Sequence, residues 1–210
     1  MKKAALHNLG CKVNAYETEA MQHLLEEAGY EIVPFTQKAD VYVINTCSVT
    51  NMADRKSRQM LHKAKKNNPD SIVVAAGCYV QTSEKEVLND LSVDIVIGND
   101  RKHDLVRLLE EYSLDSVNDT VDDINDGKHD FEELFIDQTK EHTRAFIKVQ
   151  DGCNQFCSYC IIPYARGRVR SRRFENVIAE VERLAANGFK EVVLTGIHLS
   201  SYGVDFEEAT

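Results

Sequence analysis

Hydrophobic residues follow two alternating patterns along the first half of the chain. Short apolar runs, several of them rich in β-branched residues, are typical of buried strands. They occur at residues 3–9, 40–47, 71–78 and 93–99. Each run is followed by a longer segment with apolar residues at helical spacing, such as Leu24, Leu25 and Ala28. These segments predict helices at residues 14–29, 51–69, 82–91 and 101–112.

This order of strands and helices predicts the fold class of the N-terminal part. Strands separated by helices of this length form right-handed βαβ units, whose parallel sheet is covered by helices on both faces. We therefore expect residues 1–111 to form a small, doubly wound α/β domain.

The pattern stops and then resumes as a second, incomplete α/β unit. Residues 112–142 lack clear periodicity, and we interpret them as an acidic linker with at most short ordered pieces. Within residues 143–210, a strand (143–150), a helix (174–188) and another strand (190–199) follow. Two parallel strands and one helix can neither bury both faces of a sheet nor close a barrel. We therefore expect the 210-residue chain to be the N-terminal portion of a longer protein.

Composition narrows the class of protein. The chain has 43% hydrophobic and 28% charged residues, which is ordinary for a globular protein, and no apolar run approaches the roughly 18 residues that span a bilayer. The start of the chain lacks the long apolar segment of a signal peptide, so we expect a cytoplasmic protein without a membrane partner. Disulfides are rare in that compartment, and the six cysteines are therefore candidates for metal or redox chemistry.

The net charge of −9 is a poor guide to the field around the cysteines. Residues 112–142 carry ten acidic and two basic residues, whereas residues 143–210 carry eight acidic and nine basic residues. Five of those basic residues are Arg166, Arg168, Arg170, Arg172 and Arg173. In an extended segment the first four would share one side, where their guanidinium groups could bind the phosphates of a nucleic acid. A solvated loop is the alternative.

Three of the cysteines each stand where a predicted strand ends. Cys11 follows the first strand, Cys47 the second and Cys78 the third. Because the carboxyl ends of parallel strands share one edge of a sheet, we expect the three thiols to converge there. Gly10 and Gly77 precede two of them and would let the backbone approach a bulky ligand. The alternative is that all three are small buried hydrophobic residues.

The other three cysteines, Cys153, Cys157 and Cys160, have the spacing C-x3-C-x2-C in a loop after a predicted strand. A structural zinc site needs a fourth ligand, and the nearest histidines, His142 and His198, lie outside the loop. A redox pair with C-x2-C spacing would leave Cys153 unexplained. An iron–sulfur cluster held by three thiolates keeps one iron open to an outside ligand, which fits the odd count best.

The sequence CNQFCSYC resembles the motif of radical S-adenosylmethionine enzymes. Together with the N-terminal GCKVN, NTCSVT and AAGCYVQ, it resembles the methylthiotransferase family over essentially the whole chain. The resemblance implies that residues 143–210 begin a radical S-adenosylmethionine partial (β/α) barrel, whose cysteine trio holds a 4Fe–4S cluster that binds S-adenosylmethionine. It also implies a second 4Fe–4S cluster on Cys11, Cys47 and Cys78, involved in delivering sulfur. The two sites would have to face each other across the junction between the two parts of the chain.

The same resemblance implies a function. IIPYARGR and LTGIHLSSYG are most similar to the subgroup that methylthiolates C2 of N6-threonylcarbamoyladenosine at position 37 of tRNA, using two S-adenosylmethionine molecules. Sister groups act on isopentenyladenosine 37 or on an aspartate of a ribosomal protein. A non-catalytic iron–sulfur electron-transfer module is the alternative from another class.

The resemblance also implies partners, and the positions of two residues make them further site candidates. The expected partners are the tRNA anticodon loop and an electron-donor protein such as a flavodoxin or a ferredoxin. Tyr159, inside the cysteine loop, and His198, after the second strand, are further candidates for the S-adenosylmethionine site. The alternatives are packing within the loop for Tyr159 and a structural turn for the segment that contains His198. The rest of the family's barrel and its C-terminal RNA-binding domain would lie outside the 210 residues.

Overall fold

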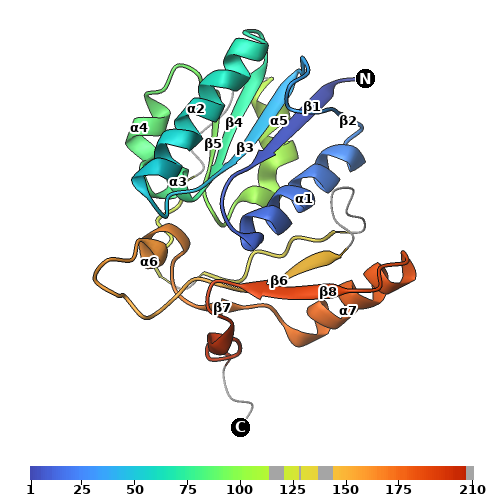
Figure 1. The fold of residues 1–210 in the computed structure, drawn as a ribbon, viewed down its shortest axis with the longest axis vertical. Coiled ribbons are helices and arrows are strands. Elements are labelled where there is room, and N and C mark those ends of the chain that lie inside the picture. Colours follow the sequence, from blue (N-terminus) through green and yellow to red (C-terminus); the bar gives the residue numbers. More distant parts are fainter. Residues whose placement is uncertain (114–120, 128, 137–143, 207–210) are drawn as a thin grey trace.

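The computed structural model describes residues 1–113, 121–127, 129–136 and 144–206, and it contains two sheets (Figure 1). All five strands of the first sheet are parallel, in the order β2-β1-β3-β4-β5. Its strands are β1 (Lys3–Asn8), β2 (Glu31–Ile32), β3 (Val41–Thr46), β4 (Ile72–Gly77) and β5 (Ile95–Ile97). Its helices are α1 (Lys12–Glu27), α2 (Asn51–Asn67), α3 (Cys78–Thr82), α4 (Glu84–Leu88), the 3-10 helix η1 (Lys102–Asp104) and α5 (Leu105–Tyr112).

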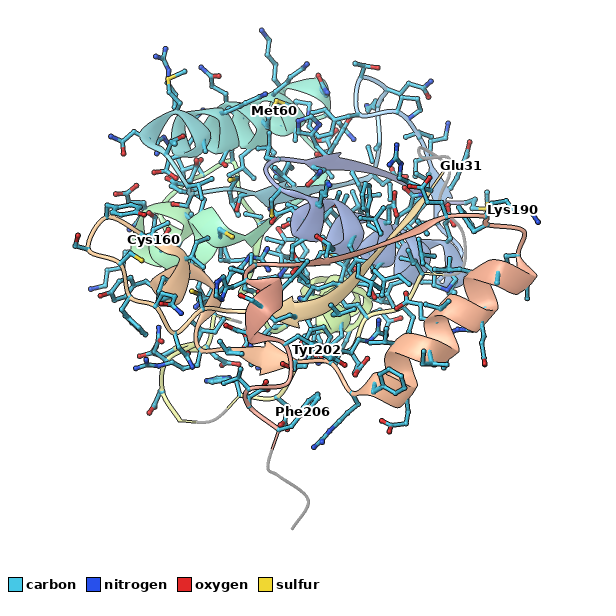
Figure 2. All side chains as sticks on the ribbon, turned by 60° about the horizontal axis from the view of Figure 1, so that its bottom comes forward. Glu31, Met60, Cys160, Lys190, Tyr202 and Phe206 are labelled. Carbon is cyan, nitrogen blue, oxygen red and sulfur yellow. The ribbon has the colours of Figure 1, made fainter. Side chains whose placement is uncertain are left out.

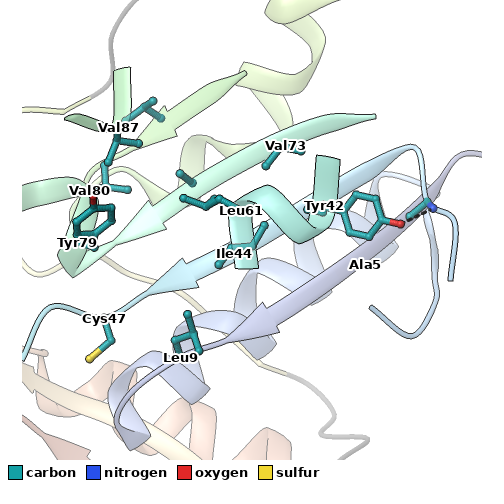
Figure 3. Packing of buried hydrophobic residues seen from close by; sticks show 14 of the residues in the cluster. Ala5, Leu9, Tyr42, Ile44, Cys47, Leu61, Val73, Tyr79, Val80 and Val87 are labelled. Carbon is teal, nitrogen blue, oxygen red and sulfur yellow. Dashed lines mark hydrogen bonds between the residues drawn. The ribbon is translucent and has the colours of Figure 1, made fainter. Parts of the chain in front are cut away.

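Alternate strand residues of the first sheet are buried on its two faces. On one face, Tyr42 and Ile44 of β3 belong to the same hydrophobic cluster as Leu61 of α2 (Figure 3). On the other face, Val43 of β3 and Val74 of β4 pack with apolar residues of α1 and α5. The expected doubly wound α/β fold is therefore confirmed. The hydrophobic pattern did not predict the short strand β2.

Helix α2 begins shortly after Cys47, and Thr50 caps it. The Thr50 hydroxyl accepts a hydrogen bond from the backbone N–H of Ala53 at 3.1 Å. We expect Thr50→Ala to lower the free energy of unfolding by about 1 kcal/mol, because this N–H loses its side-chain acceptor. Thr36→Ala, at an exposed position, should change that free energy by less than about 0.5 kcal/mol. Urea unfolding followed by circular dichroism measures both, and equal losses would contradict the capping role.

The second sheet has the order β7-β6-β8, with β8 parallel and β7 antiparallel to β6. Its elements are β6 (Ala145–Asp151), α6 (Ile162–Arg166), β7 (Arg170–Ser171), α7 (Phe174–Ala186), β8 (Val192–Gly196) and the 3-10 helix η2 (Leu199–Ser201). The parallel pair connected through α7 agrees with the expected start of a barrel. Both α6 and β7 lie where the hydrophobic pattern predicts no element. In the described part of the chain, no helix is both long and apolar enough to cross a bilayer.

Part of the acidic stretch between the two sheets packs against the rest of the protein. Leu134 and Ile136 are buried and join the apolar cluster of the second sheet. Glu133 lies 2.9 Å from the Nε atom of Arg172. Residues 132–136 are therefore anchored to the second half of the chain, because their apolar side chains have a core to enter, while most of the described residues in 122–130 are exposed. Residues 114–120, 128 and 137–143 of the expected linker lie outside the described residues.

Helix α1 packs against both parts of the chain. Met21 and Leu25 enter the core of the first sheet. Tyr16 and Ala20 instead pack in a cluster with Ile147 of β6 and other residues of the second half. The two sheets therefore share an interface built on α1, and β1 and β3 point toward the second sheet (Figure 1).

Candidate functional site

The three N-terminal cysteines, Cys11, Cys47 and Cys78, form the first cysteine trio. They line one cavity at the carboxyl edge of the first sheet. Cys11 lies in the turn after β1 and is exposed, whereas Cys47 and Cys78 directly follow β3 and β4 and are buried. Figure 3 shows Cys47 beyond the end of its strand. All three border a cavity of about 330 Å³. Burial raises the pKa of the Cys47 thiol, and the nearby thiols of Cys78 and Cys11 act in the same direction.

Glycine is required before two of these cysteines. Gly77 has a φ of +98°, and a Cβ atom there would lie 2.8 Å from the carbonyl oxygen of Thr46. Gly10 has a φ of +108°, and its Cβ atom would lie 3.0 Å from the Sγ atom of Cys47. Both glycines therefore allow neighbouring strand ends to approach each other closely.

The opposite wall of the cavity comes from the second half of the chain. Ile161, Ile162 and Ala165 contribute from the start and body of α6, and residues 195–197 contribute from the end of β8. Arg166, the last residue of α6, also borders the cavity. The loops of the second sheet thus face the first cysteine trio, as expected for two sites across one junction.

The second cysteine trio lies on the loop between β6 and α6 (Figure 2 labels Cys160). Cys157 is exposed, and Cys153 and Cys160 are partly buried. The loop begins at Gly152, whose φ is +69° and whose added Cβ atom would lie 1.8 Å from the carbonyl oxygen of Arg168. The backbone N–H of Cys160 donates to the carbonyl oxygen of Cys157 at 2.9 Å. The loop is therefore a compact turn held against the segment after α6.

The thiol donors of the two cysteine trios are of the kind that hold iron–sulfur clusters. Among the described residues, no three histidine, cysteine, aspartate or glutamate side chains lie close enough to hold one ion. A cluster contains several irons and spans a wider gap between its thiolate ligands. The first trio borders a cavity that is also lined by Arg166, whose buried Nε atom has no hydrogen-bond partner among the described residues. The donor sets and the cavity therefore fit such a group.

The five arginines do not form one shelf. Arg166, Arg170 and Arg172 are 0%, 4% and 0% exposed, whereas Arg168 and Arg173 are exposed. The segment is not extended throughout, because α6 ends at Arg166 and β7 covers only Arg170 and Ser171. The prediction that Arg166, Arg170 and Arg172 bind tRNA phosphates is wrong for this structure, because their guanidinium groups are enclosed by the protein. Only the other two remain candidates for phosphate contacts.

Arg172 connects three segments of the second half. Its guanidinium group is hydrogen bonded to Glu180 of α7 and lies 2.9 Å from Glu133. It also donates to the carbonyl oxygen of Leu134 at 3.2 Å. These contacts attach the described part of the acidic stretch to β7 and α7.

Arg166 belongs to a buried network of charges at the junction. Its Nη1 atom lies 2.8 Å from Glu17 of α1 and 3.0 Å from Asp151 of β6. Lys148 of β6 contacts the same two carboxylates at 2.9 Å and 2.8 Å. Lys102 lies 3.4 Å from Glu17. Burial alone would raise the pKa of the Glu17 carboxyl, but the surrounding cations hold it well below its usual range.

The sequence pattern did not predict this network. The signal for this network is weak. Lys148 and Asp151 are two charges in a strand that also contains Gln150, and Glu17 lies on a helix with several acidic residues. Nothing in the local spacing connects Glu17 with that strand, because the two are far apart in sequence and meet only after the two halves pack together.

The two remaining site candidates, His198 and Tyr159, differ in their surroundings. The Nδ1 atom of His198 lies 2.6 Å from the hydroxyl oxygen of Ser201, and its backbone N–H donates to Gln150 at 2.7 Å. Tyr159 is 90% exposed. Neither His198 nor Tyr159 lines the cavity beside the first trio. Their contact with S-adenosylmethionine stays a prediction.

Comparisons with known proteins match both parts of the chain. Residues 3–98 match the uncharacterized protein family UPF0004, and residues 147–209 match the radical SAM superfamily. A threonylcarbamoyladenosine tRNA methylthiotransferase, MtaB, from Bacillus subtilis is 47% identical over 99% of this chain and 46% of the relative. The protein of the same name from Aquifex aeolicus is 46% identical over 97% of this chain and 50% of the relative.

A more distant relative has a different named substrate. The tRNA-2-methylthio-N(6)-dimethylallyladenosine synthase of Bacillus mycoides is 35% identical over 99% of this chain and 42% of the relative. Among solved structures, the radical S-adenosylmethionine methyltransferase TsrM from Kitasatospora setae has a TM-score of 0.61 at 16% identity. This match covers 95% of this chain and 48% of TsrM, and at that identity it concerns the fold alone. The chain spans about half the length of these proteins.

Proposed function

The chain belongs to the radical S-adenosylmethionine methylthiotransferase family, and from this premise we propose that the whole protein methylthiolates C2 of N6-threonylcarbamoyladenosine at position 37 of tRNA. Two relatives named for the threonylcarbamoyl substrate are 47% and 46% identical, whereas relatives named for the dimethylallyl substrate are 34% to 36% identical. A further relative with the threonylcarbamoyl name, from Thermotoga maritima, is 35% identical. The higher identity of the first two relatives favours the threonylcarbamoyl group as the feature that the protein recognises.

The observation that carries this proposal is the cavity between the two halves. One wall holds Cys11, Cys47 and Cys78, and the other is formed by α6 and the end of β8. Helix α6 directly follows the loop of the second cysteine trio, so that loop begins next to one wall of the cavity, although its three cysteines do not border the cavity themselves. An enzyme that joins sulfur to a carbon activated by a radical needs two such neighbouring sites.

The roles of the residues follow from this arrangement. We propose that each trio holds one 4Fe–4S cluster through three thiolates. When bound, these groups and two S-adenosylmethionine molecules would supply the radical, the methyl group and a place for sulfur. The side chains of Val13, Val49 and Ile197 make the cavity largely apolar and would exclude water from the reacting atoms.

The proposed macromolecular partners are the tRNA anticodon loop and an electron-donor protein such as a flavodoxin or ferredoxin, in the cytoplasm. Of the five arginines, Arg168 and Arg173 are exposed and remain proposed contacts for tRNA phosphates. Arg168 lies over the ring of Phe156, with 4.3 Å between the guanidinium carbon and the ring centroid. A guanidinium group held on the cysteine loop would place positive charge beside the second site.

The proposed function is tested with the whole protein, reconstituted with iron and sulfide without oxygen. It receives S-adenosylmethionine, a strong reductant and one of three substrates: tRNA carrying N6-threonylcarbamoyladenosine 37, tRNA carrying isopentenyladenosine 37, or the ribosomal protein. Mass spectrometry of the digested products should detect the 2-methylthio group only on the first. Methylthiolation of either other substrate at an equal or higher rate would overturn the choice of substrate. Cluster formation without any methylthiolated product would favour the electron-transfer module.

A further inference from the structure

The buried network at the junction contains more positive than negative charge. Four cations surround the two carboxylates of Glu17 and Asp151. These cations are Lys102, Lys148, Arg166 and Arg170. Except for Arg170, which is 4% exposed, these groups have at most 1% of their surface exposed. A third buried carboxylate, Glu132, also acts on Lys148, so four cations face three carboxylates and one positive charge remains in excess.

The excess charge lies against the cavity that the first cysteine trio borders. Arg166 lines this cavity, and its Nε atom has no hydrogen-bond partner among the described residues. An unpaired buried N–H of a cation is costly, so such a group indicates an anionic or polar partner that enters the cavity. A cluster on three thiolates carries negative charge and meets that requirement.

Hydrogen bonds connect the same network to two of the three sulfur atoms. Asn14 accepts from Arg166 at 2.7 Å, and the Sγ atom of Cys11 lies 3.5 Å from the same Asn14 oxygen. On the other side, the side-chain amide of Asn99 lies 3.6 Å from the Sγ atom of Cys78. The same amide donates to the carbonyl oxygen of Ala165, the neighbour of Arg166, at 2.6 Å. Helix α6 is therefore held beside the first trio by contacts that also reach its sulfur atoms.

We propose that Arg166 is a positioning residue that the second half of the chain contributes to the first cysteine site, where its charge favours the reduced state of the bound cluster. This inference rests on the proposed presence of a cluster at Cys11, Cys47 and Cys78. Reduction adds one negative charge to the cluster, and a positive charge at short range in a buried site stabilises the reduced form. The N-terminal site is thus complete only when α6 is docked against it.

The test measures the reduction potential of the first cluster by itself. The parent is the whole protein with Cys153, Cys157 and Cys160 all replaced by alanine, so that only the first trio can hold a cluster. A redox titration followed by electron paramagnetic resonance gives its potential. Arg166→Met should make the reduced cluster at least about tenfold less populated at a fixed potential, a downward shift of about 59 mV for one electron. Arg166→Lys should restore part of that shift.

A matched control separates charge at the cavity from charge in general. Arg183→Met removes an exposed arginine of α7 that does not line the cavity, and it should leave the potential unchanged. Arg166→Met still leaves three cations for the three carboxylates, so we expect the variant to fold. An Arg166→Met potential equal to that of the parent, at equal iron content, would overturn the inference.

A second variant tests the inference from the opposite direction. Glu17→Gln removes a negative charge that contacts Arg166 and should shift the potential upward by a similar amount. If Arg166→Met does not fold, this variant decides: an unchanged or lower potential overturns the proposal. A parent without iron at the first trio would overturn both this inference and the proposed cluster at Cys11, Cys47 and Cys78. A whole protein that binds this cluster but makes no methylthio product contradicts only the proposed function.

Discussion

Replacing Cys157 by alanine should leave the reconstituted protein with about half of its iron and with no methylthiolated product. Two 4Fe–4S clusters hold about eight irons, and the second trio has no spare thiolate within its loop. Because the remaining two cysteines cannot hold a cluster securely, we expect about four irons, all at the first trio. Iron and sulfide analysis measures this loss, and mass spectrometry of the tRNA nucleosides measures the activity.

Two comparisons make this result specific. Ser158→Ala changes the adjacent residue in the same loop and should retain all the iron. Cys47→Ala removes a ligand at the other site and should also halve the iron content, while the cluster signal that responds to S-adenosylmethionine remains. Full iron content in Cys157→Ala, or zinc without sulfide in the unmodified protein, would show that the second trio does not hold an iron–sulfur cluster.

The second large effect is expected at Gly152, where the cysteine loop begins. An alanine there has to adopt a φ of +69° and would place its Cβ atom 1.8 Å from the carbonyl oxygen of Arg168. A backbone oxygen cannot move aside as the end of a flexible side chain can. We therefore expect Gly152→Ala to displace the loop, to lower the free energy of unfolding, and to remove the iron of the second trio.

Gly188→Ala is the matched control for this change. Gly188 also has a positive φ, +92°, but nothing lies within 4 Å of an added Cβ atom. Gly188→Ala should therefore lower the free energy of unfolding only by the strain of the left-handed conformation, about 1–2 kcal/mol, and leave the iron content unchanged. Urea unfolding and iron analysis of both variants measure the difference. Two results together would mean that the loop tolerates a side chain at its start: the two variants lose equal stability, and Gly152→Ala keeps its full iron content.

The cysteine arrangement was largely predictable because it follows from local features. The apolar runs that end before Cys47 and Cys78 form buried parallel strands, and the carboxyl ends of such strands share one edge. The convergence of the first trio therefore follows once the strands are recognised. The second trio is contained in eight consecutive residues, so its members are neighbours in any fold that the loop adopts.

The acidic stretch was harder to predict for a physical reason. Its apolar residues, including Leu134 and Ile136, are few and show no helical or strand periodicity. They are buried because cores formed by other segments accept them, and Glu133 is held by Arg172. Composition measures the average preference of a segment for water, and it does not indicate whether a few side chains will find a partner.

The sequence by itself determined the α/β fold class, the positions of the two cysteine trios and the family. Only the tertiary structure decided which arginines are available to a nucleic acid and which belong to the interior. Arg166 and Arg168 are two residues apart, yet the first is enclosed by Glu17 and Asp151 while the second is exposed. A charged group is buried only where opposite charges compensate the loss of water. Glu17 comes from a helix in the other half of the chain, so local spacing could not specify that partner.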